Sequence, residues 1–125
     1  MIRKRMPAGE SGLNLLIARY RLQARQRDLE FNLTREQFRE ITSQICHYCG
    51  AKPFMKSWNH CAKASQELQD HTVYVHNSID RLDSLRGYTT DNCVSSCHQC
   101  NWSKGKLSVS DFLSWVARVN SRSNL

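Results

Sequence analysis

Long apolar segments are missing from this chain of 125 residues. No run approaches the roughly 18 to 20 consecutive apolar residues that a transmembrane helix requires. The opening, MIRKRMPAGESG, is basic but leads into no uninterrupted apolar stretch that ends in small residues. We therefore expect no secretory signal, no membrane association and a cytoplasmic location. The length and mixed composition predict one globular domain without internal repeats.

Acidic residues are scarce, with 11 Asp and Glu against 18 Lys and Arg and a formal net charge of +7. The excess is marked at the start, where residues 1–30 hold seven basic residues and three acidic ones. Such a bias favours a polyanionic partner, because each phosphate that a basic side chain neutralises releases condensed counterions. A solvated basic helix is the alternative interpretation.

Four of the six cysteines form two Cys-x-x-Cys pairs, Cys46 with Cys49 and Cys97 with Cys100. Each such turn can offer two thiolates to one ion, and zinc takes four of them in tetrahedral geometry. The pairs predict a structural Zn²⁺ site that clamps two distant parts of the fold. A disulfide or redox role is the alternative.

The first half of the chain shows helical periodicity. Apolar residues at three- and four-residue intervals, with arginines between them, predict a helix over about residues 11–31. A second helix is expected to start at Thr34, because Thr34 and Gln37 fit a capping box. Residues 50–70 show only a weak helical hint near 62–68 and are interpreted as a connection or insertion.

The second half predicts a hairpin followed by two helices. Residues 72–76 have strand composition that can continue to Asp80, and residues 93–95 can return after a turn. A helix capped by Ser95 or Ser96 is expected to end at Gly105, and a last one to run over about 111–120.

Four motifs accompany this order of elements: Cys46-x-x-Cys49-Gly50, Ile79-Asp80-Arg81-Leu82-Asp83, Gly87-Tyr88-Thr89-x-Asp91-Asn92 and Cys97-x-x-Cys100-Asn101-x-x-Lys104-Gly105. Over about residues 35–107 they resemble the HNH endonuclease family, most closely its small phage and homing-type members. The resemblance implies an α+β fold, with a ββα-metal (HNH) core and a four-cysteine structural zinc, flanked by N-terminal helices and a C-terminal helix. We expect a basic helical extension over 1–33 and a zinc-bound HNH nuclease domain over 34–125, with an insertion at about 51–70, in a single compact domain overall.

The same resemblance implies roles for individual residues. Asp80 and Asn101 match the ligands of a catalytic Mg²⁺ or Mn²⁺, and both offer the hard oxygen atoms that such ions prefer. Asn92 matches the residue that ties the hairpin loop together and orients the site. Arg81 stands where many members have the His that activates water, and completes the expected catalytic set.

Arginine at position 81 is a departure from the family pattern with chemical consequences. A guanidinium stays protonated, so Arg81 cannot take a proton from water but can hold the scissile phosphate. The bound metal would then have to activate the water. His76 is a poor substitute base, because four strand residues separate it from Asp80 by roughly 13 Å. Asp83 is expected chiefly to cap a turn.

Double-stranded DNA is the expected partner. The candidate phosphate contacts are Arg81, Arg86, Lys104 and Lys106 beside the site, together with Arg19 and Arg25 on the N-terminal helix. A protein partner or a homodimer through the N-terminal helix is a further expectation. Trp102 and Trp115 are expected in the core, because both have apolar neighbours on helices.

The sequence thus favours a metal-dependent DNA endonuclease or nicking enzyme. The alternative is a catalytically weak or inactive zinc-stabilised HNH-fold protein that binds DNA or acts as an accessory to a partner. Retention of Asp80, Asn92 and Asn101 favours the enzyme.

Overall fold

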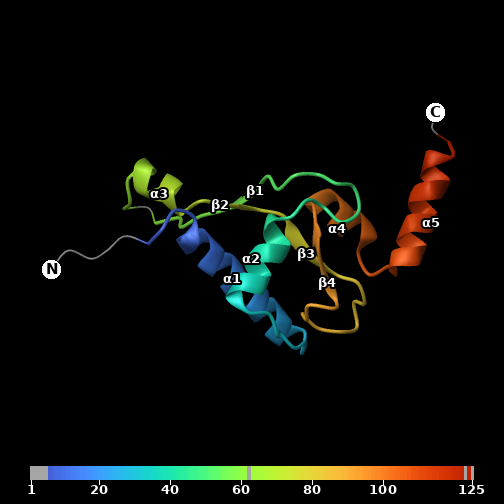
Figure 1. The fold of residues 1–125 in the computed structure, drawn as a ribbon, viewed down its shortest axis with the longest axis horizontal. Helices are drawn as coiled ribbons and strands as arrows, with labels where there is room; N and C mark the ends of the chain where they lie inside the picture. The colour runs from blue at the N-terminus through green and yellow to red at the C-terminus, as the bar shows by residue number, and fades with distance from the viewer. Residues whose placement is uncertain (1–5, 62, 123, 125) are drawn as a thin grey trace.

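The computed structural model describes residues 6–61, 63–122 and 124. Figure 1 shows the elements in chain order: α1 (Glu10–Gln26), α2 (Arg35–Ser43), β1 (Met55–Ser57), α3 (Gln66–Thr72), β2 (Tyr74–His76), β3 (Ser78–Arg81), β4 (Cys93–Ser96), α4 (His98–Lys104) and α5 (Val109–Asn120). Over the described residues, no helix combines the length and the apolar character needed to cross a bilayer.

The four strands form two separate antiparallel pairs, β1 with β2 and β3 with β4. The expected single strand over 72–80 is interrupted at Asn77, which corrects the simple hairpin prediction. Asn77 turns toward the α2 end, where its backbone N–H donates to the carbonyl of Thr42 (2.7 Å) and its side chain to the carbonyls of Gln44 and Ala51. β2 pairs instead with β1, which lies in the segment expected to be irregular.

The pair β3–β4 and the following α4 form a ββα unit. Asp80 stands opposite Val94 in this pair, and α4 packs against β3. α4 begins later than expected, because its N-cap is Cys97 instead of Ser95 or Ser96. It ends at Lys104 with Gly105 as its C-cap, as predicted.

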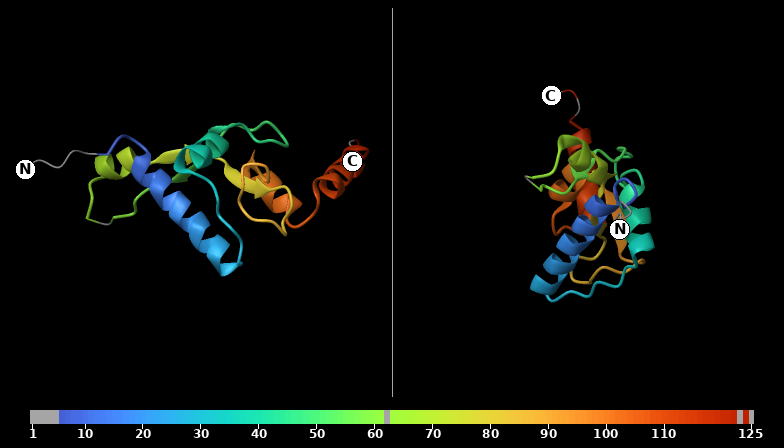
Figure 2. Two further views of the ribbon diagram at one scale, coloured as in Figure 1. Left: turned by 60° about the horizontal axis from the view of Figure 1, so that its bottom comes forward. Right: turned by 90° about the vertical axis from the view of Figure 1, so that its left-hand side faces the viewer.

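α1 packs across both strand pairs and shares a core with the rest of the chain, and Figure 2 shows it at the opposite end of the molecule from α5. Its buried side chains meet residues of α2, β3 and the β3–β4 turn; the core residues include Leu13, Leu16, Ile17, Ala24, Phe38, Ile79 and Tyr88. The close approach requires Gly12, where a Cβ would lie 2.2 Å from the carbonyl oxygen of Ser57. The basic N-terminal helix is therefore built into the core.

The predicted helix starts and tryptophan positions have mixed outcomes. The capping box at Thr34 is confirmed, because Thr34 and Gln37 each accept from the other's backbone N–H. The expectation that Trp102 and Trp115 lie in the core is wrong. Trp102 is 76% exposed and Trp115 39%, because the outer faces of α4 and α5 have no covering element in the described part of the chain.

Candidate functional site

The two Cys-x-x-Cys turns meet at the end of α2 and the start of α4. The Sγ atoms of Cys46, Cys49, Cys97 and Cys100 all lie within 4.8 Å of one another. The Cys49 and Cys97 sulfurs are 3.6 Å apart. Tetrahedral zinc with bonds of about 2.3 Å separates its sulfurs by about 3.8 Å, so the cluster is compatible with a metal such as zinc.

Thiolate formation is favoured within this cluster at one position. Burial alone would raise the pKa of Cys46, but backbone hydrogen bonds from Cys97, Cys49 and Tyr48 lower it to about 6. A thiolate is the form that ligates a metal.

The turn between β3 and β4 is tied together by Asn92, as the sequence predicted. Its Oδ1 accepts from the backbone N–H of Asp83 (2.9 Å), and its Nδ2 donates to the carbonyls of Asp83 and Gly87. Asn92 is buried and touches no part of the site cavity described below. Asp83 caps the turn through the N–H of Leu85, which confirms its expected role.

The carboxylate of Asp80 is buried between two side chains. Tyr48 donates its hydroxyl to Oδ2 of Asp80 at 2.6 Å. Nζ of Lys104 lies 3.3 Å from the same oxygen and 3.4 Å from Oδ1. Burial and then the hydrogen bond to Asp80 raise the pKa of Tyr48. The carboxylate is thus fixed by a neutral donor and a cation.

The burial of Lys104 corrects one expectation. Its side chain has no exposed surface, so it cannot reach a phosphate at the surface. Besides Asp80, Nζ also lies 3.4 Å from the carbonyl oxygen of Arg81. Lys104 acts on the site through these buried contacts.

Asn101 presents its amide oxygen away from β3. The hydroxyl of Ser78 donates to the carbonyl of Ser96 (2.6 Å), so it can only accept from Asn101, whose Nδ2 lies 3.2 Å away. This assigns the amide orientation and leaves Oδ1 of Asn101 available as a hard oxygen donor. Asn101 and Asp80 line the same cavity, so the residue types expected for a divalent ion are brought together.

Arg81 has a structural attachment that the sequence did not reveal. Its Nη1 donates to the carbonyls of Ser84 (2.6 Å) and Arg86 (2.9 Å), and its guanidinium lies 5.4 Å from the ring centre of Tyr88. These contacts use one nitrogen of a group with five donors. The Arg81 side chain also lines a cavity, which is described next.

The cavity has a volume of about 1050 Å³ and opens between the C-terminal part of α1, the β3–β4 turn and α4. We call it the site groove, and its lining includes Tyr20, Gln23, Arg27, Asp80, Arg81, Leu85, Asn101, Trp102 and Lys106. Tyr20 also accepts from the backbone N–H of Ile79 at 3.0 Å, which attaches α1 to the strand that bears Asp80. Burial raises the pKa of Tyr20 to about 12.

The other predicted DNA contacts are distributed unevenly. Lys106 lines the site groove, whereas Arg86 lies on the surface and pairs with Asp91 at 2.8 Å. Arg19 and Arg25 are exposed but do not line the groove. Arg25 follows Gln23 by two residues, which places it roughly 200° around the helix. Arg27, the C-cap residue that follows α1, lines the groove instead.

Histidine is absent from the lining of the site groove in the described residues. His76 lies buried on β2, where its Nδ1 contacts the carbonyl of Asn77 and its Nε2 the hydroxyl of Ser57, both at 2.9 Å. The prediction that His76 is no direct base is therefore consistent with its contacts.

Tyr48 and Arg27 are the site residues that sequence reasoning missed. Tyr48 belongs to no apolar period, and its only signal was its place inside the first Cys-x-x-Cys turn. Arg27 was one basic residue among several in the N-terminal segment, and only the packing of α1 shows that this C-cap arginine lines the same groove as Asp80.

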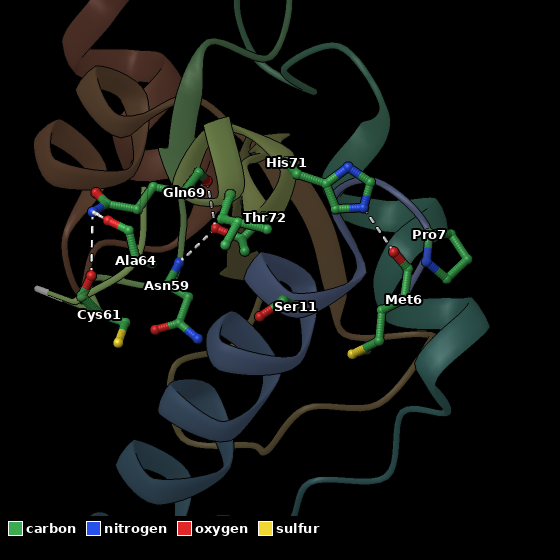
Figure 3. Close-up of a pocket in the computed structure, with 10 residues that line it drawn as sticks. Met6, Pro7, Ser11, Asn59, Cys61, Ala64, Gln69, His71 and Thr72 are labelled. Carbon is green, nitrogen blue, oxygen red and sulfur yellow. Dashed lines mark hydrogen bonds between the residues drawn. The ribbon is translucent and has the colours of Figure 1, made fainter. Parts of the chain in front are cut away.

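A smaller cavity of about 250 Å³ lies away from the site, between α3 and the start of α1 (Figure 3). Its polar groups are engaged within the fold, because His71 contacts the carbonyl of Met6 (2.7 Å) and Gln69 donates to the carbonyls of Cys61 and Ala64. It contributes no group to the site groove.

The fold of the chain is similar to that of a solved structure. The rare-cutting HNH restriction endonuclease PacI, which is described as perturbing DNA, superposes with a TM-score of 0.56 at 20% identity. The match covers 80% of this chain and 70% of PacI. The chain has the HNH fold. The ββα unit with its adjacent four-cysteine cluster is thus the HNH core that the sequence motifs predicted.

Sequence comparison adds one relative. Protein R423 of Acanthamoeba polyphaga mimivirus, described as uncharacterized, is 33% identical over 95 residues, which are 76% of this chain. The aligned part spans only 14% of the length of R423. No protein-family model matches the chain.

Proposed function

We propose that this chain is a metal-dependent HNH endonuclease or nicking enzyme that hydrolyses phosphodiester bonds in double-stranded DNA. The observation that carries the proposal is the meeting of Asp80, Arg81 and Asn101 on one groove of an HNH fold. The likeness to a restriction endonuclease supports nuclease activity, and the groove supports these residues as its site.

Asp80 and Asn101 would hold the catalytic Mg²⁺ or Mn²⁺ through a carboxylate and an amide oxygen. Such an ion supplies Lewis-acid activation of water and neutralises charge on the phosphate. Tyr48 and Lys104 position the Asp80 carboxylate. Asn92 acts indirectly, because it fixes the turn that carries Arg81's carbonyl partners.

Arg81 would hold the scissile phosphate with the donors that the turn carbonyls leave free. Its fixed charge stabilises the additional negative charge of the transition state. Arg27 and Lys106 extend the cationic lining to either side, and Arg86, Arg19 and Arg25 would add outer phosphate contacts.

The four-cysteine cluster would hold a structural Zn²⁺, which fastens the α2 end to the start of α4. A reducing cytoplasm would keep the four thiols available for the metal. We further propose that residues 1–33 are a basic extension of the 34–125 nuclease domain. Any partner or second copy at α1 would meet its outer face, where Leu15 and Leu22 are half exposed.

An HNH-fold DNA-binding protein with weak or no catalysis is the second candidate. It is favoured by one observation, the absence of histidine from the lining of the groove over the described residues. Both candidates predict DNA binding, and only the first predicts strand cleavage.

The test is cleavage of supercoiled plasmid by zinc-loaded protein, with and without added Mg²⁺ or Mn²⁺. Asp80→Asn keeps the shape of the side chain and removes its charge, so we expect it to abolish metal-dependent nicking. Thermal unfolding verifies that the variant is still folded, because Lys104 loses its buried partner. Asp111→Asn is the matched control, because Asp111 is exposed on α5 and lies outside the groove. Salt-sensitive DNA binding without cleavage under any metal condition would favour the second candidate.

A further inference from the structure

Two large apolar side chains beside the HNH site are exposed. Trp102 on α4 has 76% of its surface exposed, and Leu85 in the β3–β4 turn has 88%. Both line the site groove with Asp80 and Arg81. We call these two side chains the apolar edge. Leaving a tryptophan in water forgoes the free energy that its burial would release, so the position calls for an apolar partner.

The apolar edge is held in place from behind. The Trp102 ring packs on the ring of His98, with centroids 5.6 Å apart, one helical turn earlier on α4. Leu85 stands at a turn tip whose backbone N–H donates to Oδ1 of Asp83 at 3.0 Å. The neighbouring Asn101 is anchored to Ser78. These contacts restrict both side chains before a partner binds. Binding would therefore cost little conformational entropy at the apolar edge.

Charge around the apolar edge identifies the class of partner. Arg27, Arg81 and Lys106 line the same groove, against the two acidic residues Asp28 and Asp80. Cations beside an apolar face fit a molecule that carries phosphates and flat π surfaces together, and nucleic acid is such a molecule. An acidic protein surface would satisfy the cations but would leave Trp102 and Leu85 in water.

The geometry of DNA then restricts what these side chains can touch. In an intact duplex the faces of the bases are covered by their neighbours, and only the edges are open in the grooves. Apolar side chains reach the base faces by entering a step that is partly unstacked. Stacking of one base on an aromatic side chain is tolerant of sequence, because every base has a π face.

Resting on the proposed nuclease function, we propose that Trp102 and Leu85 contact unstacked bases beside the cleavage position. Trp102 stacks on a base that has left the helix, and Leu85 contacts the distorted step from the β3–β4 turn, across the same groove. The preferred substrate is then duplex DNA that carries an unpaired or distorted step, rather than regular duplex.

Equilibrium binding tests this preference without any cleavage. Two fluorescein-labelled duplexes of the same sequence, one with a single-base bulge, are titrated with zinc-loaded full-length protein in the absence of Mg²⁺. The variants are Trp102→Ala and Leu85→Ala. The matched controls are Trp115→Ala and Leu22→Ala, whose side chains are partly exposed but lie outside the groove. Thermal unfolding verifies that each variant is folded.

The parent is expected to bind the bulged duplex more tightly than the paired one. Trp102→Ala should weaken binding to the bulged duplex roughly 5- to 100-fold and remove the preference, while the dependence on salt stays unchanged. Lys106→Ala should weaken binding to both duplexes and lower the salt slope by about one. A 2-aminopurine at the bulge should change its fluorescence with the parent but not with Trp102→Ala.

Equal affinities of the parent and Trp102→Ala for the bulged duplex would overturn the proposal. The same holds if Trp115→Ala loses as much affinity as Trp102→Ala. Because the binding assay involves no strand cleavage, its outcome is independent of the plasmid cleavage test. A preference for the bulged duplex without plasmid cleavage would support the role of Trp102 and Leu85 and reject the nuclease function. Plasmid cleavage without an effect of Trp102→Ala on binding would support the nuclease function and reject the role of the apolar edge.

Discussion

Nζ of Lys104 lies 3.3 Å from Oδ2 of Asp80, and neither side chain has more than 6% of its surface exposed. Removing one partner of such a buried pair leaves an uncompensated charge, at a cost of about 3–5 kcal/mol. We therefore expect Lys104→Met to lower the free energy of unfolding by several kcal/mol, measured by urea denaturation. The double variant Lys104→Met with Asp80→Asn should recover most of that loss, and equal instability of the two variants would contradict the pairing.

Tyr48 is expected to position the Asp80 carboxylate, which the proposed function makes a metal ligand. Tyr48→Phe removes the 2.6 Å hydrogen bond to Asp80 but keeps the ring, so nicking activity should fall about tenfold with little change in unfolding temperature. Tyr74→Phe is the control, since its hydroxyl contacts Thr42 at 2.7 Å, outside the site groove. That variant should alter stability alone. Unchanged activity of Tyr48→Phe would remove Tyr48 from the site.

Loss of one cysteine of the proposed zinc cluster should loosen the fold around the site groove. Cys97→Ser is expected to lower the zinc content, measured by atomic absorption, and to reduce the unfolding temperature, because the α2 end and the start of α4 lose their shared clamp. Cys61→Ser is the matched control, because this exposed thiol lies outside the cluster. Full zinc content in Cys97→Ser would exclude Cys97 as a ligand.

Gly12→Ala should destabilise the protein although alanine is the better helix former. An added Cβ would lie 2.2 Å from the Ser57 carbonyl oxygen and 2.4 Å from that of Thr72. The resulting displacement of α1 should cost about 1–3 kcal/mol by denaturant titration. Leu15→Ala, at a half-exposed position of the same helix, should have a smaller effect. A stabilised Gly12→Ala would show that α1 lies farther from the strands.

Stability should fall in mild acid through His76. Burial is the main cause that lowers the pKa of His76 below its usual 6.5. The contribution of neutral His76 to the free energy of unfolding is complete above the pKa that this residue has in the unfolded state. It is lost as the pH falls toward the lower pKa of the folded state, because the unfolded state then binds more protons. Between about pH 7.5 and pH 5.5, His76→Gln should show a shallower loss of stability than the parent. Exposed His60 provides the control, and His60→Gln should follow the parent.

The local features of the fold were predictable because they depend on neighbours in the chain. The cysteine pairs, the Thr34 capping box and the Asn92 loop contacts all follow from short motifs. Strand partners were not predictable in the same way. Whether residues 74–76 pair with β4 or with β1 depends on Asn77 reaching the carbonyls of Gln44 and Ala51, far away in the sequence.

Side-chain burial at the site was also beyond sequence reasoning. Lys104 and Trp102 lie two residues apart on α4, and the sequence suggested a surface cation and a core aromatic. The structure reverses both positions, because the helix turns Lys104 toward Asp80 and Trp102 toward the groove. A helix of seven residues has only about two turns, too few for the spacing of its apolar residues to show which face is buried.

The break at Asn77 separates β3, which carries Asp80, from the pair formed by β1 and β2. Among the described residues β1 pairs with β2 alone, on the side of Asn77 away from Asp80, and none of those between 51 and 72 lines the site groove. Shortening, lengthening or exchanging the connections around β1 and α3 would leave the spacing of Asp80, Asn92 and Asn101 unaltered. The connection between β1 and α3 is therefore a suitable position for inserting an additional segment.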